Sequence, residues 1–182
     1  MVTRADLGTT IDLNELGKYV PNYIYEPDQF PALFYRVHNP RITFIVFASG
    51  KVMGYGGQVL SDVRYEFTRL AESLAPLGIR IETATLPKIC MLVGTSFIGQ
   101  PIDIESLAKN LSNVVYEPDQ FPGLIWTLER GIVVLAFSNG KLVITGVKSA
   151  ERLMTIYNEV IRLIMEHHTF QRHQITSKEL IA

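Results

Sequence analysis

The chain has only one cysteine, Cys90, among its 182 residues. No disulfide can therefore form within it, which favours a reducing compartment. Long hydrophobic runs are also missing, because charged residues, glycine or proline interrupt every apolar stretch before it reaches membrane-spanning length. The N-terminal residues lack the apolar segment of a secretory signal. These absences predict a protein that is neither exported nor held in a membrane.

An excess of charge of either sign is absent as well. Lysine and arginine number 17 and aspartate and glutamate 18, which gives a net charge of −1. Such a balance gives no global reason to expect a polyanion as partner. With 47% apolar and 19% charged residues, the chain is expected to fold into a globular protein with one or two ordinary cores.

The residue patterns of enzymes and metal sites are also missing. His167, His168 and His173 lie close together, but no cysteines or acids accompany them at ligand spacing, so we interpret them as surface residues. Residues 145–149 include a lysine and a serine but lack the glycines of a phosphate-binding loop. We therefore expect a protein that is not an enzyme and that uses no cofactor and no metal ion.

The most informative feature of the sequence is an internal repeat. The heptapeptide YEPDQFP occurs at residues 25–31 and again at 116–122, an offset of 116 − 25 = 91. FASGK at 47–51 corresponds to FSNGK at 137–141, an offset of 137 − 47 = 90, so one residue is missing from the second copy. We expect two domains built on one unit, a first repeat at 1–87 and a second repeat with a C-terminal tail at 88–182.

Each copy combines helical and strand patterns. Short helices are expected at residues 11–19 and 102–111, and the 3.6-residue apolar period predicts longer ones from Val59 to Leu77 and from Leu153 to Ile164. The expected strands are residues 32–37, 42–47, 51–55, 79–84 and 88–97, with second-copy counterparts at 123–128, 132–137 and 141–145.

The two faces of these strands are equally apolar, unlike those of a sheet with one face in water. Because the predicted helices can cover only one face, the other face must meet a second layer, a second subunit or a ligand. A sheet that is simply buried on both faces is the alternative. The residue pattern does not decide between them.

The segments YEPDQFPALFYRVHNPRITFIVFASGK and YEPDQFPGLIWTLERGIVVLAFSNGKLVITGVKS resemble the TATA-box-binding protein family, and its archaeal members most, from Val2 to His167. The resemblance implies an α+β fold in which two pseudo-symmetric repeats form a saddle-shaped, curved antiparallel sheet with helices on the convex face. It also implies a general transcription initiation factor whose concave face binds the minor groove of A·T-rich promoter DNA and bends it.

The family's functional residues match particular positions of this chain. In the family, two pairs of phenylalanines wedge between base steps; the matching residues are Phe30, Phe47, Phe121 and Phe137. Other DNA-contacting positions match Arg36, Ser49, Lys51, Val93, Lys141, Val143, Thr145 and Lys148, and apolar groove positions match Val2, Ile45 and Leu135.

The resemblance also implies protein partners. Glu117, Asp119 and Gln120 match the loop that receives transcription factor B in the family, and the RNA polymerase machinery would follow that factor. The expected location is the archaeal cytoplasm, at the nucleoid, or a eukaryotic nucleus. Self-association of the free protein through the concave face stays an open alternative.

Four positions depart from the family pattern. Met91 stands where the family has a central asparagine, whose first-repeat counterpart would precede Met1; Tyr55 replaces a threonine, Gln58 a lysine and Thr127 an arginine. Because two cationic side chains are lost, we expect weaker or less A·T-selective DNA binding than in an ordinary member. The alternative function is that of a divergent paralogue, a protein-interaction module or regulator of transcription with weak or no TATA binding.

Overall fold

The computed structural model describes residues 1–168, and the chain divides into two compact units, Met1–Met91 and Leu92–Ala182. In the first unit, six strands form an antiparallel sheet in the order β2-β3-β4-β5-β1-β6. These strands are β1 (Val2–Asp6), β2 (Tyr23–Ile24), β3 (Ala32–Val37), β4 (Ile42–Phe47), β5 (Lys51–Gly56) and the first part of β6 (Thr85–Phe97). The helices are α1 (Leu13–Leu16), α2 (Leu60–Ser73) and two 3₁₀ turns, η1 (Ala75–Leu77) and η2 (Ile81–Thr83).

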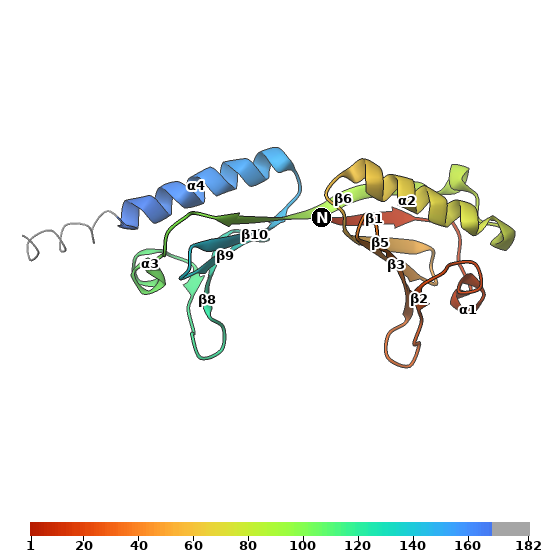
Figure 1. Cartoon of the computed structure of the whole chain (residues 1–182), viewed down its shortest axis with the longest axis horizontal. Helices are drawn as coiled ribbons and strands as arrows, with labels where there is room; N and C mark the ends of the chain where they lie inside the picture. Colours follow the sequence, from red (N-terminus) through yellow and green to blue (C-terminus); the bar gives the residue numbers. More distant parts are fainter. Residues whose placement is uncertain (169–182) are drawn as a thin grey trace, which may run out of the picture. The chain divides into compact units, whose positions relative to one another are not determined.

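The second unit repeats this plan with five antiparallel strands in the order β6-β10-β9-β8-β7. Its strands are the second part of β6, β7 (Val114–Val115), β8 (Gly123–Glu129), β9 (Ile132–Phe137) and β10 (Lys141–Val147), and its helices are α3 (Ile104–Asn110) and α4 (Ala150–His168). In each unit the long helix crosses one face of the sheet, and the loop before β3 or β8 extends on the other side (Figure 1). The α+β fold of antiparallel strands and helices is confirmed.

The short helices begin where an aspartate caps them. The Asp12 carboxylate accepts a hydrogen bond from the backbone N–H of Asn14 at 2.9 Å, and the Asp103 carboxylate accepts one from Ser106 at 2.9 Å. Each cap satisfies an N–H that has no partner inside the helix. The repeat is therefore preserved in the local interactions as well as in the sequence.

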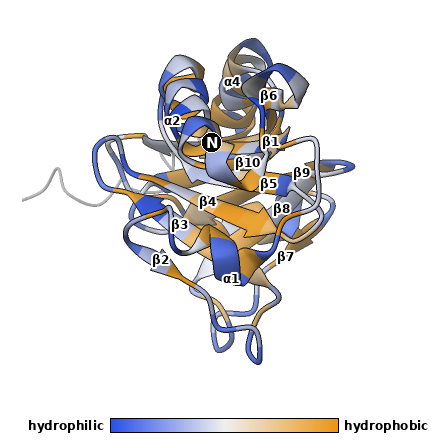
Figure 2. Ribbon diagram, turned by 90° about the vertical axis from the view of Figure 1, so that its right-hand side faces the viewer, coloured by the Kyte–Doolittle hydropathy of each residue, from blue (hydrophilic) through white to orange (hydrophobic). Residues whose placement is uncertain are grey.

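Each unit has its own hydrophobic core between the sheet and the long helix. Alternate residues of β4 are buried, and Phe44 packs on Phe67 of α2 with ring centroids 6.4 Å apart. In the second unit, alternate residues of β9 are buried in the same way and pack in one cluster with Ile156, Val160 and Ile164 of α4. Figure 2 shows the strands as largely hydrophobic and the outward side of α2 as hydrophilic.

The residues between the buried ones define what we call the open face of each unit. It includes Thr43, Ile45 and Phe47 of β4 in the first unit and Val133, Leu135 and Phe137 of β9 in the second, all of them half-buried. The helices thus cover one face only, and the alternative of a sheet buried on both faces is wrong for either unit taken singly.

Several expected elements differ from those observed. The strand expected at 79–84 is wrong: Gly78 adopts φ +79° after η1, and the chain then turns through η2, where the Arg80 carbonyl accepts from Thr83. The helix expected at 11–19 is confined to four residues. Strand β1 was not anticipated because two charged residues in five obscure its period, and β2 and β7 are too short to show one. None of the helices among residues 1–168 is long and apolar enough to cross a membrane.

Candidate nucleic-acid interface

A pair of phenylalanine rings lies at the same place on the open face of each unit. The ring centroids of Phe30 and Phe47 are 6.3 Å apart at an interplanar angle of 59°, and those of Phe121 and Phe137 are 5.8 Å apart at 63°. All four rings are partly accessible, and Phe30 is 40% exposed. Tilted pairs at this spacing are favourable aromatic contacts. Each pair therefore presents a preformed apolar edge that can insert between stacked planar groups.

The repeated heptapeptide fixes the first ring of each pair. In the first unit, the Glu26 carbonyl accepts hydrogen bonds from the N–H groups of Gln29 and Phe30 at 3.0 and 2.9 Å. The Glu117 carbonyl accepts the corresponding two bonds, both at 2.9 Å. Proline follows the glutamate in both copies, and its fixed φ suits the second position of such a turn. The same seven residues thus place Phe30 and Phe121 equivalently.

The FASGK and FSNGK turns fix the second ring. Gly50 adopts φ +81° and Gly140 φ +91°, and a Cβ on them would lie 2.0 Å from the Thr9 carbonyl oxygen and 2.2 Å from that of Gln100. Only glycine suits both the conformation and the close approach. Because the turns are held in this way, Phe47 and Phe137 keep their position relative to the lysine that begins the next strand.

The surroundings of the two pairs are not identical. Gly123 lies opposite Phe137 in the β8–β9 ladder, at the position that Ala32 takes opposite Phe47. A Cβ on Gly123 would lie 2.9 Å from a ring carbon of each phenylalanine of its pair. In the first unit, Phe34 adds a third ring, 5.4 Å from Phe30.

Basic side chains lie on the same faces. Arg36 lies opposite Thr43 and Lys51 opposite Asp6, and Lys141 begins β10 beside Phe137. All three are exposed, and none forms an ion pair with another described residue. By contrast, each of the four ion pairs given for residues 1–168 includes a residue of a helix: Lys18–Glu15, Arg69–Glu66, Arg152–Glu129 and Arg162–Glu166. The unpaired cations of the open faces are free to meet an anion.

The other expected contact residues divide between the two units. Ser49 is exposed in the first unit's turn. On the second unit's open face, Val93 of β6 lies opposite Thr145 of β10, and Val143 lies two residues earlier on β10. Lys148 lies just beyond β10, where it lines a hollow of about 340 Å³ together with Arg130 and Arg152. At the offset of 90, the first unit has Gln58 in place of Lys148 and Asp62 in place of Arg152, so two of the three cations of this hollow are not repeated in the first unit.

Sequence reasoning missed two residues of these faces. Arg4 of β1 is exposed opposite Met53, and Phe97 of β6 is 66% exposed opposite Lys141. Both were missed because β1 was not recognised and because the expected strand 88–97 was not assigned to a face. The repeat offset of 91 places Phe97 at the position of Asp6, so Lys51 faces an acid where Lys141 faces an aromatic ring.

Three of the four departures from the family pattern lie on the open faces, and the fourth, Gln58, is exposed in the loop between β5 and α2. Tyr55 is 43% exposed and pairs with Thr43 and Val2, Thr127 is exposed opposite Val133, and Met91 pairs with Val2. The acids of the two heptapeptide loops are exposed at the far side from the long helices. No group of metal-ligating side chains occurs among the described residues; His173 and the side chain of His168 lie outside them.

Two copies of one α+β unit, each with a helix on one sheet face and a phenylalanine pair on the other, define a two-repeat protein whose candidate binding surface is a sheet face. The family described as "Transcription factor TFIID (or TATA-binding protein, TBP)" matches residues 1–77 and 86–167, one match in each repeat. The chain belongs to this family, which consists of DNA-binding transcription factors and not of enzymes.

Individual relatives agree with this assignment. The chain is 35% identical over 167 residues to a TATA-box-binding protein of Aeropyrum pernix, covering 91% of this chain and 82% of that protein. It is 34% identical over 154 residues to one of Archaeoglobus fulgidus, covering 83% and 84%. Among solved structures, Methanococcus jannaschii TBP superposes with a TM-score of 0.80 at 34% identity, covering 91% of this chain and 95% of that one. The resemblance stated from the sequence is confirmed.

Proposed function

We propose that this protein is a transcription initiation factor that binds the minor groove of A·T-rich promoter DNA with the open faces of both units. The single observation that carries the proposal is the phenylalanine pair at the same place in each unit. A ring inserted between base steps replaces part of the stacking lost at a kink, and the bent duplex then meets more of the protein. The proposed role is therefore to bend the DNA by wedging.

The remainder of each open face suits the same ligand. Half-buried apolar side chains such as Ile45, Leu135 and Val143 can lie against A·T pairs, whose minor groove lacks the guanine amino group. Arg36, Lys51, Lys141 and Lys148 supply cations for the phosphates. Such a face responds to composition and deformability of the duplex more than to base identity.

The protein partner proposed is transcription factor B, with RNA polymerase following it to the promoter. Glu117, Asp119 and Gln120 form an exposed loop in the second unit, and its acids suit a basic surface. The first-unit loop has the same sequence, so this loop alone cannot orient the protein on DNA. The archaeal relatives favour the nucleoid as the place of action.

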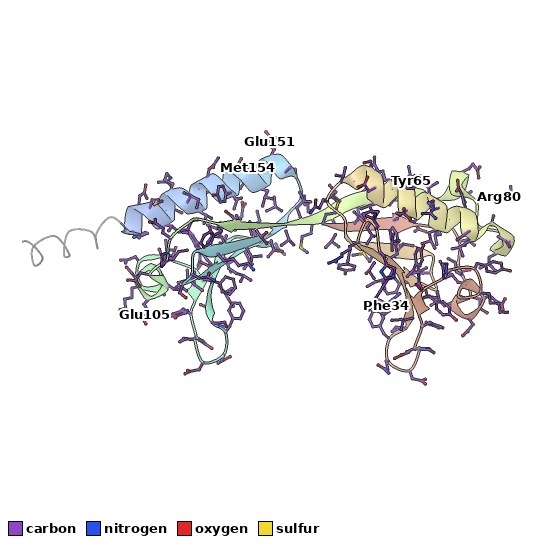
Figure 3. All side chains as sticks on the ribbon, in the orientation of Figure 1. Phe34, Tyr65, Arg80, Glu105, Glu151 and Met154 are labelled. Carbon is purple, nitrogen blue, oxygen red and sulfur yellow. The ribbon has the colours of Figure 1, made fainter. Side chains whose placement is uncertain are left out.

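The test of wedging is a DNA-bending measurement by energy transfer, together with an affinity titration, on A·T-rich and G·C-rich duplexes. The double variant Phe121→Ala/Phe137→Ala should lose the bend and weaken binding by roughly 5- to 150-fold for each ring that stacks. Tyr65→Ala is the matched control, because Tyr65 is equally aromatic but lies 64% exposed on α2, on the helix side of its sheet (Figure 3).

A double variant that still bends the duplex as the wild type does contradicts wedging. A wild-type protein that does not prefer the A·T-rich duplex contradicts the proposed ligand and favours the protein-interaction alternative, for which the exposed Tyr55 is a specific reason. For the partner, Glu117→Lys/Asp119→Lys should abolish the ternary gel shift with transcription factor B. Glu26→Lys/Asp28→Lys, the same change in the first unit, should preserve it.

A further inference from the structure

The open faces of the two units differ in the size of their side chains. One row of residues crosses the paired strands of each unit next to the phenylalanine pair, and the repeat offsets of 91 and 90 allow the two rows to be compared position by position. The row consists of Ile24, Phe34, Ile45, Met53 and Arg4 in the first unit and of Val115, Ile125, Leu135, Val143 and Thr95 in the second. The first unit has the larger side chain at four of the five positions and an isomeric one at the fifth.

The next row of each open face follows the same trend. It consists of Arg36, Thr43, Tyr55 and Val2 in the first unit and of Thr127, Val133, Thr145 and Val93 in the second. Arg36 and Tyr55 are larger than their counterparts, and the other two pairs are of equal size. The open face of the first unit is therefore the bulkier one in both rows.

Phe34 connects this bulk to the phenylalanine pair. It is half-buried on the side of the sheet away from α2 (Figure 3), and its ring centroid lies 5.4 Å from that of Phe30. Phe30 in turn lies 6.3 Å from Phe47, so both neighbours are within the range of favourable aromatic contacts. The second unit has Ile125 in place of Phe34. The aromatic surface of the first unit thus continues from the pair onto the face beside it.

A duplex must widen its minor groove to meet such a face. Three neighbouring strands span about 10 Å, whereas the minor groove of B-DNA is about 6 Å wide. Larger side chains on the strands require further widening, and the cost of widening depends on the base sequence. A-tracts are stiff with a narrow minor groove, whereas TA steps deform easily. The bulkier first unit is therefore the one that gains more from an easily deformed half-site.

We propose that Phe34 and Tyr55 are specificity-determining residues, which make the first unit take the more deformable half of an asymmetric A·T-rich site. This inference rests on the proposed function, because it requires DNA on the open faces. It gives Tyr55, which departs from the family pattern, a role in choosing the DNA sequence.

The arginines of the first unit act in the opposite sense. Arg4 and Arg36 lie in the two rows, and a narrow minor groove attracts cations. Their long side chains can turn toward the phosphates of a wide groove as well, whereas the Phe34 ring packs on Phe30 and cannot turn aside. We therefore expect the aromatic side chains to decide the preference.

The test measures which unit lies on which half of a duplex with alternating TA steps in one half and an A-tract in the other. Asp28→Cys in a Cys90→Ser background supplies a single cysteine for an iron chelate that cleaves nearby DNA, since Asp28 is exposed in the heptapeptide loop of the first unit. Cleavage at the TA end should exceed cleavage at the A-tract end by about fivefold or more.

The decisive variants exchange residues between the two units. Phe34→Ile/Tyr55→Thr gives the first unit the side chains of the second, and Ile125→Phe/Thr145→Tyr does the reverse. Either double variant should make cleavage at the two ends nearly equal, and all four substitutions together should invert the preference. Because each introduced residue already occupies the corresponding position of the other unit, the fold should persist, and thermal melts check this.

Tyr65→Thr is the matched control. It makes the same substitution as Tyr55→Thr in the same unit, but Tyr65 lies 64% exposed on α2, on the helix side of the sheet. It should leave the cleavage ratio unchanged. An affinity titration gives a second readout: Phe34→Ile/Tyr55→Thr should improve binding to an A-tract duplex relative to a duplex of alternating TA steps, and Tyr65→Thr should not.

The possible failures are distinguishable. A wild type that binds the asymmetric duplex but cleaves both ends equally, or mainly the A-tract end, overturns the inference and leaves the proposed function standing. A preference that the four-residue exchange does not invert overturns it as well, because the direction then comes from other residues. A wild type that does not prefer A·T-rich to G·C-rich DNA overturns the proposed function and the inference together.

Discussion

Gly123→Ala tests how the second phenylalanine pair is positioned. Gly123 lies on the open face opposite Phe137, and the added Cβ would lie 2.9 Å from Cε1 of Phe137 and 2.9 Å from Cε1 of Phe121. Carbon atoms in contact are normally 3.5–4.0 Å apart. The two rings must therefore move away from the new methyl group before the variant can fold.

The first unit shows the spacing that the two rings would adopt in the variant, because Ala32 already occupies the position that corresponds to Gly123. The centroids of Phe30 and Phe47 are 6.3 Å apart and those of Phe121 and Phe137 are 5.8 Å apart, a difference of 6.3 − 5.8 = 0.5 Å. The rings are partly exposed and can shift toward solvent, so we expect the lower end of the cost of overpacking, about 1 kcal/mol. For a chain of this size that corresponds to a fall in Tm of about 2–4 °C.

Calorimetry gives the stability change, and the ring signals of the two phenylalanines in an NMR spectrum report their displacement. Ala32→Gly is the reciprocal variant: it removes the methyl group and should cost about 0.5–1 kcal/mol through backbone entropy. A loss well above 3 kcal/mol for Gly123→Ala, or ring signals that do not move, would refute the reasoning, since the rings would then be unable to adopt the spacing of the first unit.

Three further variants test the core, a turn and the charge of the open face. Phe67→Ala, at a side chain with no exposed surface, should lower the free energy of unfolding by about 3–5 kcal/mol in urea titrations; a loss below 1 kcal/mol would contradict its central place. Gly146→Ala should destabilise the protein far more than Gly78→Ala. Both glycines have positive φ, but only at Gly146 would the added Cβ meet a backbone oxygen, that of Gly131 at 1.6 Å; equal melting points would contradict this. Thr127→Arg should steepen the dependence of DNA affinity on log salt by about 0.9 if the new cation reaches a phosphate, and Thr127→Ala should not.

The repeat explains why so much of the fold could be predicted. Strands 32–37, 42–47 and 132–137 are observed with the expected bounds, because two copies of one pattern leave little freedom of register. The strands 42–47 and 132–137 also end at the glycine turns of Gly50 and Gly140. The segments that failed lack such a signal. Val2–Asp6 contains two charged residues, and 79–84 follows a left-handed glycine that redirects the chain.

In the candidate site, too, the residues fixed by local backbone geometry could be predicted from the sequence and those placed by strand pairing could not. The heptapeptide and the FASGK turn locate Phe30 and Phe47 from sequence, since their backbone geometry is local. The position of Lys51 opposite Asp6, and of Lys141 opposite Phe97, depends on which strands are neighbours in the sheet. The paired residues are 45 positions apart in the first unit and 44 in the second. No local pattern encodes it.

These pairings bear on how a nearly symmetric protein distinguishes one direction from the other. The heptapeptide loops have the same sequence in the two units and so favour neither orientation on a duplex. The ring pairs occupy the same place but differ in their neighbours, Ala32 and Phe34 in the first unit and Gly123 in the second. The cations are not equivalent: the first unit has Arg36 where the second has Thr127, and the second has Lys148 where the first has Gln58. Lys148 lines a hollow with Arg130 and with Arg152, which is paired with Glu129. Lys51 faces an acid that reduces its attraction for a phosphate, whereas Lys141 does not. Because phosphate attraction falls off within about 10 Å in salt, each unit of the proposed complex would act on the nearest part of the DNA backbone. We therefore expect a preferred direction to come from these substitutions on the open faces and at the hollow rather than from the repeated loops.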